Sequence, residues 1–395
     1  MSRPALELAD IFRQHGEAYR AQQALPLQAL RVMRAIEICR TAVLGGHVEQ
    51  CSQCGFTRIS YNSCRNRHCP KCQNTDRQHW LQQRQAELLP VEYFHVVFTV
   101  PEQIAAIALH NKAVVYGLLF RMVAATLTTI ARDPRHLGAE IGFFAVLHTW
   151  GQNLLHHPHL HCVVPGGGLS PDGSRWIACR RGFFLPYGWL SRLFRRLFLE
   201  ALAAAFDHGQ LSFHGALLPL QNRAAFTAFL LPLHRTEWVV YAKPPFGGPP
   251  QVLEYLGRYT HRVAISNERL RALDDTSVTF QWKDYRQPEK PKLMRLDANE
   301  FIRRFLLHVL PPGFQRIRHF GWLANRNRNA KLALCRKLIA TPLIELRPSP
   351  QACQQLQQIL DTASPARCPQ CSKGEMLRIQ TLPAYRWPAR PPDTS

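Results

Sequence analysis

The sequence predicts an α+β fold in which short strands and longer helices follow a helical, cysteine-rich N-terminal module. Residues 93–100 and 143–149 have the apolar, β-branched and aromatic composition of strands. Residues 103–132 and 187–206 instead repeat apolar residues at helical spacing. Residues 47–78 are dense in Cys, His and Arg and have little apolar periodicity. Something other than hydrophobic burial must therefore organise that part of the chain.

The same patterns predict the order of the remaining elements and divide the chain into three parts. Near the N-terminus they indicate two helices within residues 4–44, ended by Gly45-Gly46, and a third helix at 76–89. The expected parts are residues 1–90, which are helical and cysteine-rich, residues 91–340, and residues 341–395 as a Pro-rich tail with a Cys pair.

In the central part, residues 143–149 and 159–164 are expected to pair as antiparallel strands. Another strand is expected at 238–242, and a Pro/Gly loop then leads to a helix at 250–261, because Pro249-Pro250 suits a first helical turn. The elements expected after it are strands at 263–266 and 277–282, a helix at 298–309 and a basic stretch at 314–331.

The charge of the chain points to a polyanionic partner. It has 49 basic and 27 acidic residues, a formal net charge of +22, and only nine of the bases are Lys. Arg presents a planar fork that matches phosphate oxygens two at a time. A codon preference for Arg over Lys would leave the net charge unchanged, so it does not explain the scarcity of acids. We therefore expect the partner to be nucleic acid.

The N-terminus and the cysteines indicate a cytoplasmic protein. The first five residues lead into a charged helical pattern and not into a signal peptide. Close Cys pairs in an intracellular protein are typical of metal ligands and not of disulfides. We expect no stretch with the roughly 18 consecutive apolar residues that are needed to span a bilayer. We expect a soluble protein without a membrane partner, associated with the nucleoid when bound to DNA.

Two CxxC pairs within residues 47–78 predict a structural zinc site. Paired thiolates at this spacing turn back on themselves, and two such turns supply four tetrahedral ligands, here Cys51, Cys54, Cys69 and Cys72. Cys64 and His68 lie between the pairs and could replace one ligand or complete a second site. Basic residues surround this segment and suit phosphate contacts. They are Arg58, Arg65, Arg67, Lys71 and Arg77. The alternative is a basic surface that contacts only solvent.

A further pair, Cys368 and Cys371, has the spacing of half a zinc site. Its partners could be Cys353 or Cys335, or it could bind no metal. No zinc site is assigned to this pair from the sequence.

The histidine-rich segment at 156–161 predicts a second kind of metal site. On a strand, His159 and His161 project from one face while Leu160 turns to the other. Two imidazoles on one face can share a divalent cation, and His157 or Gln152 could supply a third ligand.

Two tyrosines on the helix expected at 250–261 add a possible nucleophile. Tyr255 and Tyr259 are four residues apart, so both hydroxyls leave one face of a helix, flanked by Arg258 and Arg262, which can hold a phosphate. A tyrosine oxygen can attack a phosphodiester that a metal has polarised. Without the histidines, packing residues of an amphipathic helix would be the simpler interpretation.

Taken in order, these motifs resemble those of rolling-circle insertion-sequence transposases. The resemblance covers about residues 10 to 340. It rests on residues 63–72 (SCRNRHCPKC), the HUH motif at 157–161 (HPHLH), the two-tyrosine helix at 255–266 (YLGRYTHRVAIS), and the basic blocks 313–321 (GFQRIRHFG) and 323–326 (LANR).

The resemblance implies an HUH nuclease-like domain, a small antiparallel sheet with flanking helices. It implies that His159 and His161 bind Mg²⁺ or Mn²⁺ and that Tyr255 and Tyr259 cleave DNA strands. The bond energy would stay in a phosphotyrosine link, so no nucleotide cofactor is expected. The oligomeric state is left open. The alternatives are a non-catalytic, zinc-dependent DNA-binding regulator, and a replication initiator or relaxase with the same chemistry.

Overall fold

The centre of the protein is a five-stranded antiparallel sheet. The computed structural model describes residues 6–73, 84–85, 87–243, 264–283, 292–339 and 367–385. The sheet has the order β12-β4-β5-β3-β8. Its strands are β12 (Ile317–Gly321), β4 (Gly142–Trp150), β5 (His156–Pro165), β3 (Tyr93–Thr99) and β8 (Val240–Lys243). The predicted pairing of residues 143–149 with 159–164 is confirmed, and the α+β class with it.

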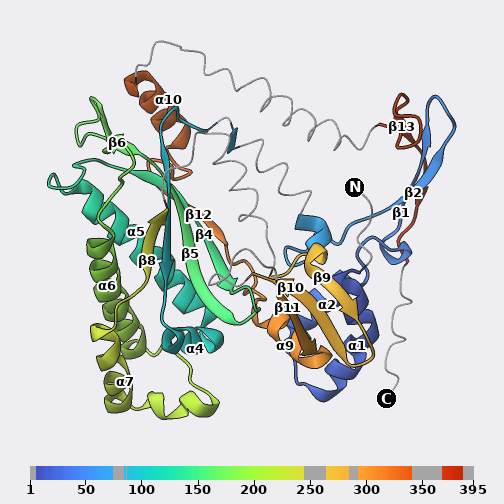
Figure 1. The fold of residues 1–395 in the computed structure, drawn as a ribbon, viewed down its shortest axis with the longest axis horizontal. Helices are drawn as coiled ribbons and strands as arrows, with labels where there is room; N and C mark the ends of the chain where they lie inside the picture. The colour runs from blue at the N-terminus through green and yellow to red at the C-terminus, as the bar shows by residue number, and fades with distance from the viewer. Residues whose placement is uncertain are drawn as a thin grey trace, which may run out of the picture.

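Helices cover one face of this sheet (Figure 1). Alternate residues of the strands, among them Phe98, Leu147 and Leu160, point into a core with these helices, since side chains alternate between the two faces of a strand. The helices are α4 (Glu102–His110), α5 (Lys112–Arg132), α6 (Tyr187–Asp207) and α7 (Arg223–Arg235). The sequence had predicted α4 and α5 as one helix, but they separate at Asn111.

Among the described helices, α5 alone is long and apolar enough to cross a bilayer, which the sequence interpretation had not expected. More than half of its most apolar window, 56%, is buried inside the protein. Its residues Tyr116, Phe120 and Val123 are fully buried against the sheet. The apolar face of α5 is thus occupied by the protein core.

A second body joins the N-terminus to residues 264–309 (Figure 1). Phe12 packs edge to face on Phe305 at 5.5 Å, and the two lie in one buried cluster with residues of both segments. This body contains α1 (Leu8–Gln22), α2 (Leu27–Glu37), α9 (Ala298–Leu307) and a sheet of order β11-β10-β9 (Lys292–Asp297, Ser277–Trp282, Leu270–Leu273). The predicted boundary at residue 90 therefore does not separate two cores, because the N-terminal helices bury their apolar stripes against a segment much later in the chain.

The C-terminal segment forms part of a third sheet. β13 (Met376–Leu382) pairs antiparallel with β1 (Gly46–Cys51), which also pairs with β2 (Thr57–Tyr61). At least residues 367–385 thus fold onto the N-terminal part of the chain, where the sequence predicted only a tail. The other described elements are β6 (Gly167–Leu169), β7 (Trp176–Ala178), α10 (Arg328–Ile339) and the 3₁₀ turns η1 (Ala42–Leu44), η2 (Gly215–Gln221) and η3 (Asn267–Arg269).

Two of the remaining predictions lie mostly or wholly outside the described residues, namely the helices at 76–89 and 250–261. The strand expected at 263–266 is wrong: among its described residues, Ala264 and Ile265 are buried in the second body without strand pairing. Several described elements were not predicted: the helices α7 and α10 and the strands β1, β2, β6, β7, β9, β11, β12 and β13.

Candidate metal centre and nucleic-acid interface

The sheet face opposite the helices carries a row of histidines. His159 and His161 lie on β5, two residues apart, so both project from this face while Leu160 enters the core. His148 on β4 stands directly opposite His159 in the strand register. The register of β3 puts His95 on the same face. The predicted pair thus shares one face of a central strand, and neighbouring strands add two more imidazoles.

Three of these rings form a group that can hold a metal ion. His148, His159 and His161 each offer a nitrogen, and these atoms lie within 4.8 Å of one another. His159 Nδ1 donates to the His157 carbonyl at 2.7 Å, and His161 Nδ1 lies 2.8 Å from His95 Nε2. These contacts occupy Nδ1 and leave Nε2 to a ligand, the usual arrangement of metal-binding histidines. Burial lowers the pKa of His159 to about 4, so this ring is neutral at neutral pH.

The third histidine of the group was missed by the sequence interpretation. It named Gln152 or His157, whereas the structure brings His148 to the pair. Gln152 lies in the turn after β4, and its carbonyl accepts a hydrogen bond from Arg269 at 2.6 Å. The ring of His157 is outside the group. A lone histidine in the otherwise apolar strand β4, paired with β5, was the signal that could have identified His148.

The four predicted zinc ligands do not come together, and the prediction of one site is corrected to two clusters. Each cluster takes one CxxC pair and adds two cysteines from elsewhere. The first cysteine cluster holds Cys39, Cys64, Cys69 and Cys72, and the second holds Cys51, Cys54, Cys368 and Cys371. In both, the ligand atoms lie within 4.8 Å of one another.

The ribbon of β1 and β2 is the physical reason for this division. Cys51 ends β1, so the turn with Cys51 and Cys54 lies at the far end of the ribbon (Figure 1). The chain returns along β2 to Cys64, whose backbone N–H donates to Cys39 Sγ at 3.5 Å. Cys72 Sγ lies 3.7 Å from Cys39 Sγ and 3.6 Å from Cys64 Sγ. Cys39 was missed because it stands alone, just beyond α2, without a CxxC partner.

Comparison with known proteins identifies the family. A family model described as "Putative transposase" matches residues 142–331, and one described as "Transposase zinc-binding domain" matches residues 11–100. A putative transposase of Sinorhizobium fredii is 61% identical over 398 residues, covering 100% of both chains. The chain belongs to the transposase family that these proteins represent. The transposase for insertion sequence element IS801 of Pseudomonas savastanoi pv. phaseolicola is 27% identical over 291 residues, covering 73% of this chain and 68% of that protein.

These matches fall on the sites described above. The zinc-binding domain of this transposase contains the whole first cysteine cluster and the Cys51–Cys54 half of the second. The match at 142–331 begins at β4 and contains His148, His159 and His161. As a transposase the protein acts on DNA, in agreement with its net charge of +22.

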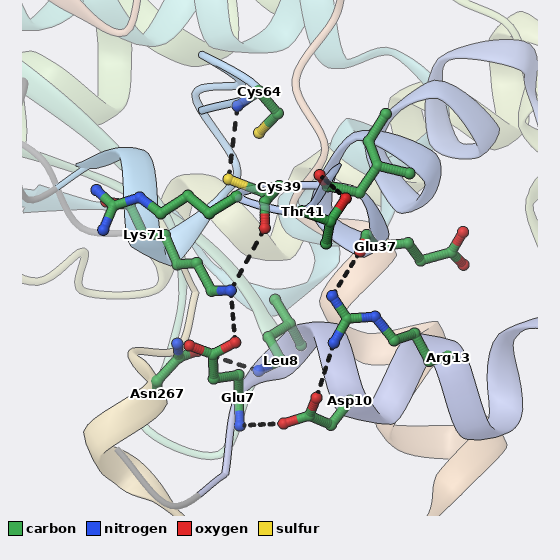
Figure 2. A network of polar contacts seen from close by, with 12 residues as sticks. Glu7, Leu8, Asp10, Arg13, Glu37, Cys39, Thr41, Cys64, Lys71 and Asn267 are labelled. Atoms are coloured by element: carbon green, nitrogen blue, oxygen red, sulfur yellow. Dashed lines mark hydrogen bonds and ion pairs between the residues drawn. The ribbon is translucent and has the colours of Figure 1, made fainter. Parts of the chain in front are cut away.

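Three of the bases predicted to contact phosphate have partners inside the transposase, namely Arg58, Arg67 and Lys71. Arg58 Nε lies 2.6 Å from Glu49 Oε2. Lys71 Nζ lies 2.5 Å from Glu7 Oε2 and donates to the Cys39 carbonyl at 3.4 Å (Figure 2). The side chains of Lys71 and Glu7 are only 12% and 6% exposed. This buried ion pair joins the start of α1 to the first cysteine cluster. Lys71 therefore has a structural role and is not proposed as a phosphate ligand.

Arg67 and Arg65 differ from each other, and Arg77 lies outside the described residues. Arg67 donates from one terminal nitrogen to the Phe314 carbonyl and from the other to the Pro311 carbonyl, the latter at 2.6 Å. Those contacts attach the zinc-binding domain to the loop before β12. Arg65 is exposed. Phosphate contact therefore remains a proposal for Arg65 and not for Arg67.

Alanine substitution separates these roles. We expect Lys71→Ala to lower the free energy of unfolding by about 3 kcal/mol, because it leaves the Glu7 carboxylate buried without its cation. Arg65→Ala should change stability by less than about 0.5 kcal/mol. It should instead weaken DNA binding uniformly across sequences and reduce the slope of log affinity against log salt by about 1. Urea unfolding and DNA-binding titrations at several salt concentrations measure both; a stable Lys71→Ala variant would contradict the structural role.

The predicted nucleophiles and their flanking bases, Tyr255, Tyr259, Arg258 and Arg262, lie outside the described residues. The described chain stops at Lys243, on the strand beside β3, and resumes at Ala264.

Proposed function

We propose that this transposase cleaves and rejoins single-stranded DNA through a bond between a tyrosine and a 5′-phosphate, in a rolling-circle mode of transposition. The observation that carries the proposal is the group of His148, His159 and His161, whose predicted pair is hydrogen-bonded through Nδ1. Such a group fits a divalent cation and has no evident use in a protein that only binds DNA.

The donor set of this group fits a divalent cation and favours one of the two predicted ions. Mg²⁺ prefers oxygen ligands, whereas imidazole nitrogen binds more readily to transition-metal ions. We therefore expect Mn²⁺ to support cleavage at lower concentration than Mg²⁺. When bound by His148, His159 and His161, the cation would polarise the scissile phosphate and offset its charge.

Segment 244–263 contains both tyrosines. The described residues at its two ends support the proposal that it belongs to the histidine site. Lys243 on β8 pairs with His95 on β3, and His95 contacts His161. Ala264 lines a small cavity together with Trp150, whose ring stacks on that of His148 at 4.7 Å. The described residues that flank the segment therefore both lie near the histidine group.

In the proposed reaction, the oxygen of Tyr255 attacks the scissile phosphorus. A tyrosine–phosphate bond forms, the bond to the 3′-oxygen breaks, and that oxygen takes up a proton as the tyrosine loses one. The phosphodiester energy is kept, so a later 3′-hydroxyl can reverse the step without a nucleotide cofactor. Tyr259 would accept the second strand, and Arg258 and Arg262 would hold phosphate oxygens. We propose that the reaction takes place in the cytoplasm, on DNA of the nucleoid.

A covalent-adduct assay tests the proposal. Single-stranded fragments that tile both strands of the DNA flanking the gene are labelled at either end and incubated with the protein and Mn²⁺. We expect one fragment to give an SDS-stable adduct that retains the 3′ label and loses the 5′ label, and we expect none with EDTA or with the duplex form.

Each other outcome has a distinct meaning. DNA binding without an adduct on any fragment would contradict strand cleavage and favour a zinc-dependent regulator. An adduct that retains the 5′ label would contradict the proposed polarity. Cleavage without rejoining of an added 3′-hydroxyl strand would contradict the proposed strand transfer.

A further inference from the structure

The second cysteine cluster joins the two ends of the chain. Cys51 and Cys54 belong to the turn between β1 and β2, and Cys368 and Cys371 immediately precede β13. Cys51 Sγ lies 3.7 Å from Cys371 Sγ, and Cys54 Sγ lies 3.6 Å from Cys368 Sγ. The family match for the zinc-binding domain ends at residue 100, so it contains only one half of this cluster.

The spacing of the sulfurs suits a tetrahedral zinc ion and not a disulfide. Four thiolates at about 2.3 Å from Zn²⁺ lie roughly 3.8 Å from one another at the corners of a tetrahedron. A disulfide brings two sulfurs to about 2.05 Å. The two sulfur–sulfur distances, 3.7 and 3.6 Å, are close to the tetrahedral value. Each joins a cysteine of one CxxC pair to a cysteine of the other.

The two CxxC turns have matching backbone geometry. The N–H of Gly55 donates to the Cys51 carbonyl at 3.3 Å, and the N–H of Ser372 donates to the Cys368 carbonyl at 2.9 Å. Both residues are left-handed, with φ of 71° and 57°. For Ser372 this conformation is unfavourable, so the surrounding structure must hold it in place.

Backbone N–H groups also point at the sulfurs. Gln53 N and Cys54 N lie 3.4 and 3.5 Å from Cys51 Sγ, and Gly374 N lies 3.4 Å from Cys371 Sγ. Donors in these positions favour the thiolate form, which is the form that binds metal.

Contacts between the two turns hold the halves together. Ser52 N donates to the Glu375 carbonyl at 2.9 Å, and Glu375 N donates to Ser52 Oγ at 3.1 Å. Gly374 passes so close to Cys51 Sγ that a Cβ at this position would collide with the sulfur. The C-terminal turn is therefore shaped to meet the N-terminal one.

We propose that Cys51, Cys54, Cys368 and Cys371 bind a second structural zinc ion, separate from the ion of the first cysteine cluster. Residues 367–385 are then an integral part of the zinc-binding module, because the ion connects the turn before β13 to the turn after β1. The proposal does not depend on the proposed strand cleavage.

Zinc stoichiometry tests the proposal. We expect two thiolate-bound zinc ions per wild-type chain, and one after Cys368→Ser/Cys371→Ser. Cys51→Ser/Cys54→Ser should lose the same ion, so the quadruple variant should also keep one. The control is Cys179→Ser, a half-buried thiol outside both clusters, which should keep two. Atomic emission gives the zinc content. Cobalt substitution gives a thiolate charge-transfer band that the histidines cannot produce, and its intensity should halve in each double variant.

Two outcomes would overturn the proposal. One is unchanged zinc content in Cys368→Ser/Cys371→Ser, and the other is a disulfide between the two pairs in metal-free wild-type protein under reducing conditions. Gly374→Ala keeps the test decisive if the serine variants fold poorly. It retains all four thiols, yet it should release one zinc ion to a chelator at least tenfold faster, because the new methyl group displaces Cys51 Sγ. Release of both ions at the wild-type rate would contradict the assignment.

Discussion

Replacing His159 with alanine is expected to abolish strand cleavage and leave the thiolate-bound zinc unchanged. The substitution removes one of the three nitrogens offered by His148, His159 and His161 but none of the contacts in either cysteine cluster. Loss of charge stabilisation at the scissile phosphate should lower the cleavage rate by on the order of 10³-fold. Single-turnover cleavage of the responsive fragment at fixed Mn²⁺ measures the effect. His148→Ala should do the same, because His148 stands opposite His159 in the strand register.

Two matched variants sharpen this prediction. His208→Ala changes an exposed histidine outside the group and should cleave at the wild-type rate. His95→Ala removes the partner of His161 Nδ1. It should weaken Mn²⁺ binding by about 10- to 100-fold and regain most of its rate at high Mn²⁺, as expected of a positioning residue. If His159→Ala cleaved at the wild-type rate under limiting Mn²⁺, the histidines would have no part in the mechanism.

The histidine site was predictable as far as local geometry determines it. The two-residue period of a strand is sufficient to put His159 and His161 on one face, and the apolar runs on either side identify β4 and β5 as strands. The third member, His148, depends on the pairing register. A bulge between His148 and Trp150 shifts that register near the turn, so counting residues across the hairpin is unreliable.

The cysteine partnership was not predictable, because CxxC spacing reports a local turn and says nothing about which other turn completes the site. Cys54 and Cys368 are 314 residues apart. The nearer pair, Cys69 and Cys72, was the natural partner by sequence, yet the β1–β2 ribbon carries Cys51 and Cys54 away from it. β13 was missed for a related reason: its residues alternate weakly and most are exposed, so only pairing with β1 makes it a strand.

The joint core of the N-terminal helices and residues 264–309 was also hidden from sequence analysis. The helices α1 and α9 were predicted, but the apolar face of a helix does not specify which segment packs against it. In the structure Phe12 and Phe305 meet across these helices, and Leu8 N donates to Asn267 Oδ1 at 3.1 Å. Lys243, the last described residue before segment 244–263, thus lies on the five-stranded sheet, and Ala264, the first after it, is buried in this joint core.

Replacing both predicted nucleophiles should eliminate the covalent adduct. Phenylalanine keeps the ring but has no oxygen to attack phosphorus, so Tyr255→Phe/Tyr259→Phe should lose adduct formation by a factor on the order of 10⁶, the range found when a catalytic nucleophile is removed. DNA binding and zinc content should not change. Tyr187→Phe is the control, since Tyr187 is 66% exposed at the start of α6 and is not on the strands that carry the histidine group.

The single variants distinguish the order of the two tyrosines. If Tyr255 attacks first, Tyr255→Phe forms no adduct, whereas Tyr259→Phe forms the adduct but cannot accept the second strand, so the adduct accumulates without rejoined product. Equal adduct from both single variants would mean that the two hydroxyls are interchangeable in the first step. An adduct that persists in the double variant at the wild-type level would show that the nucleophile is another group. The metal ion held by His148, His159 and His161 would then polarise the phosphate for a nucleophile outside residues 244–263.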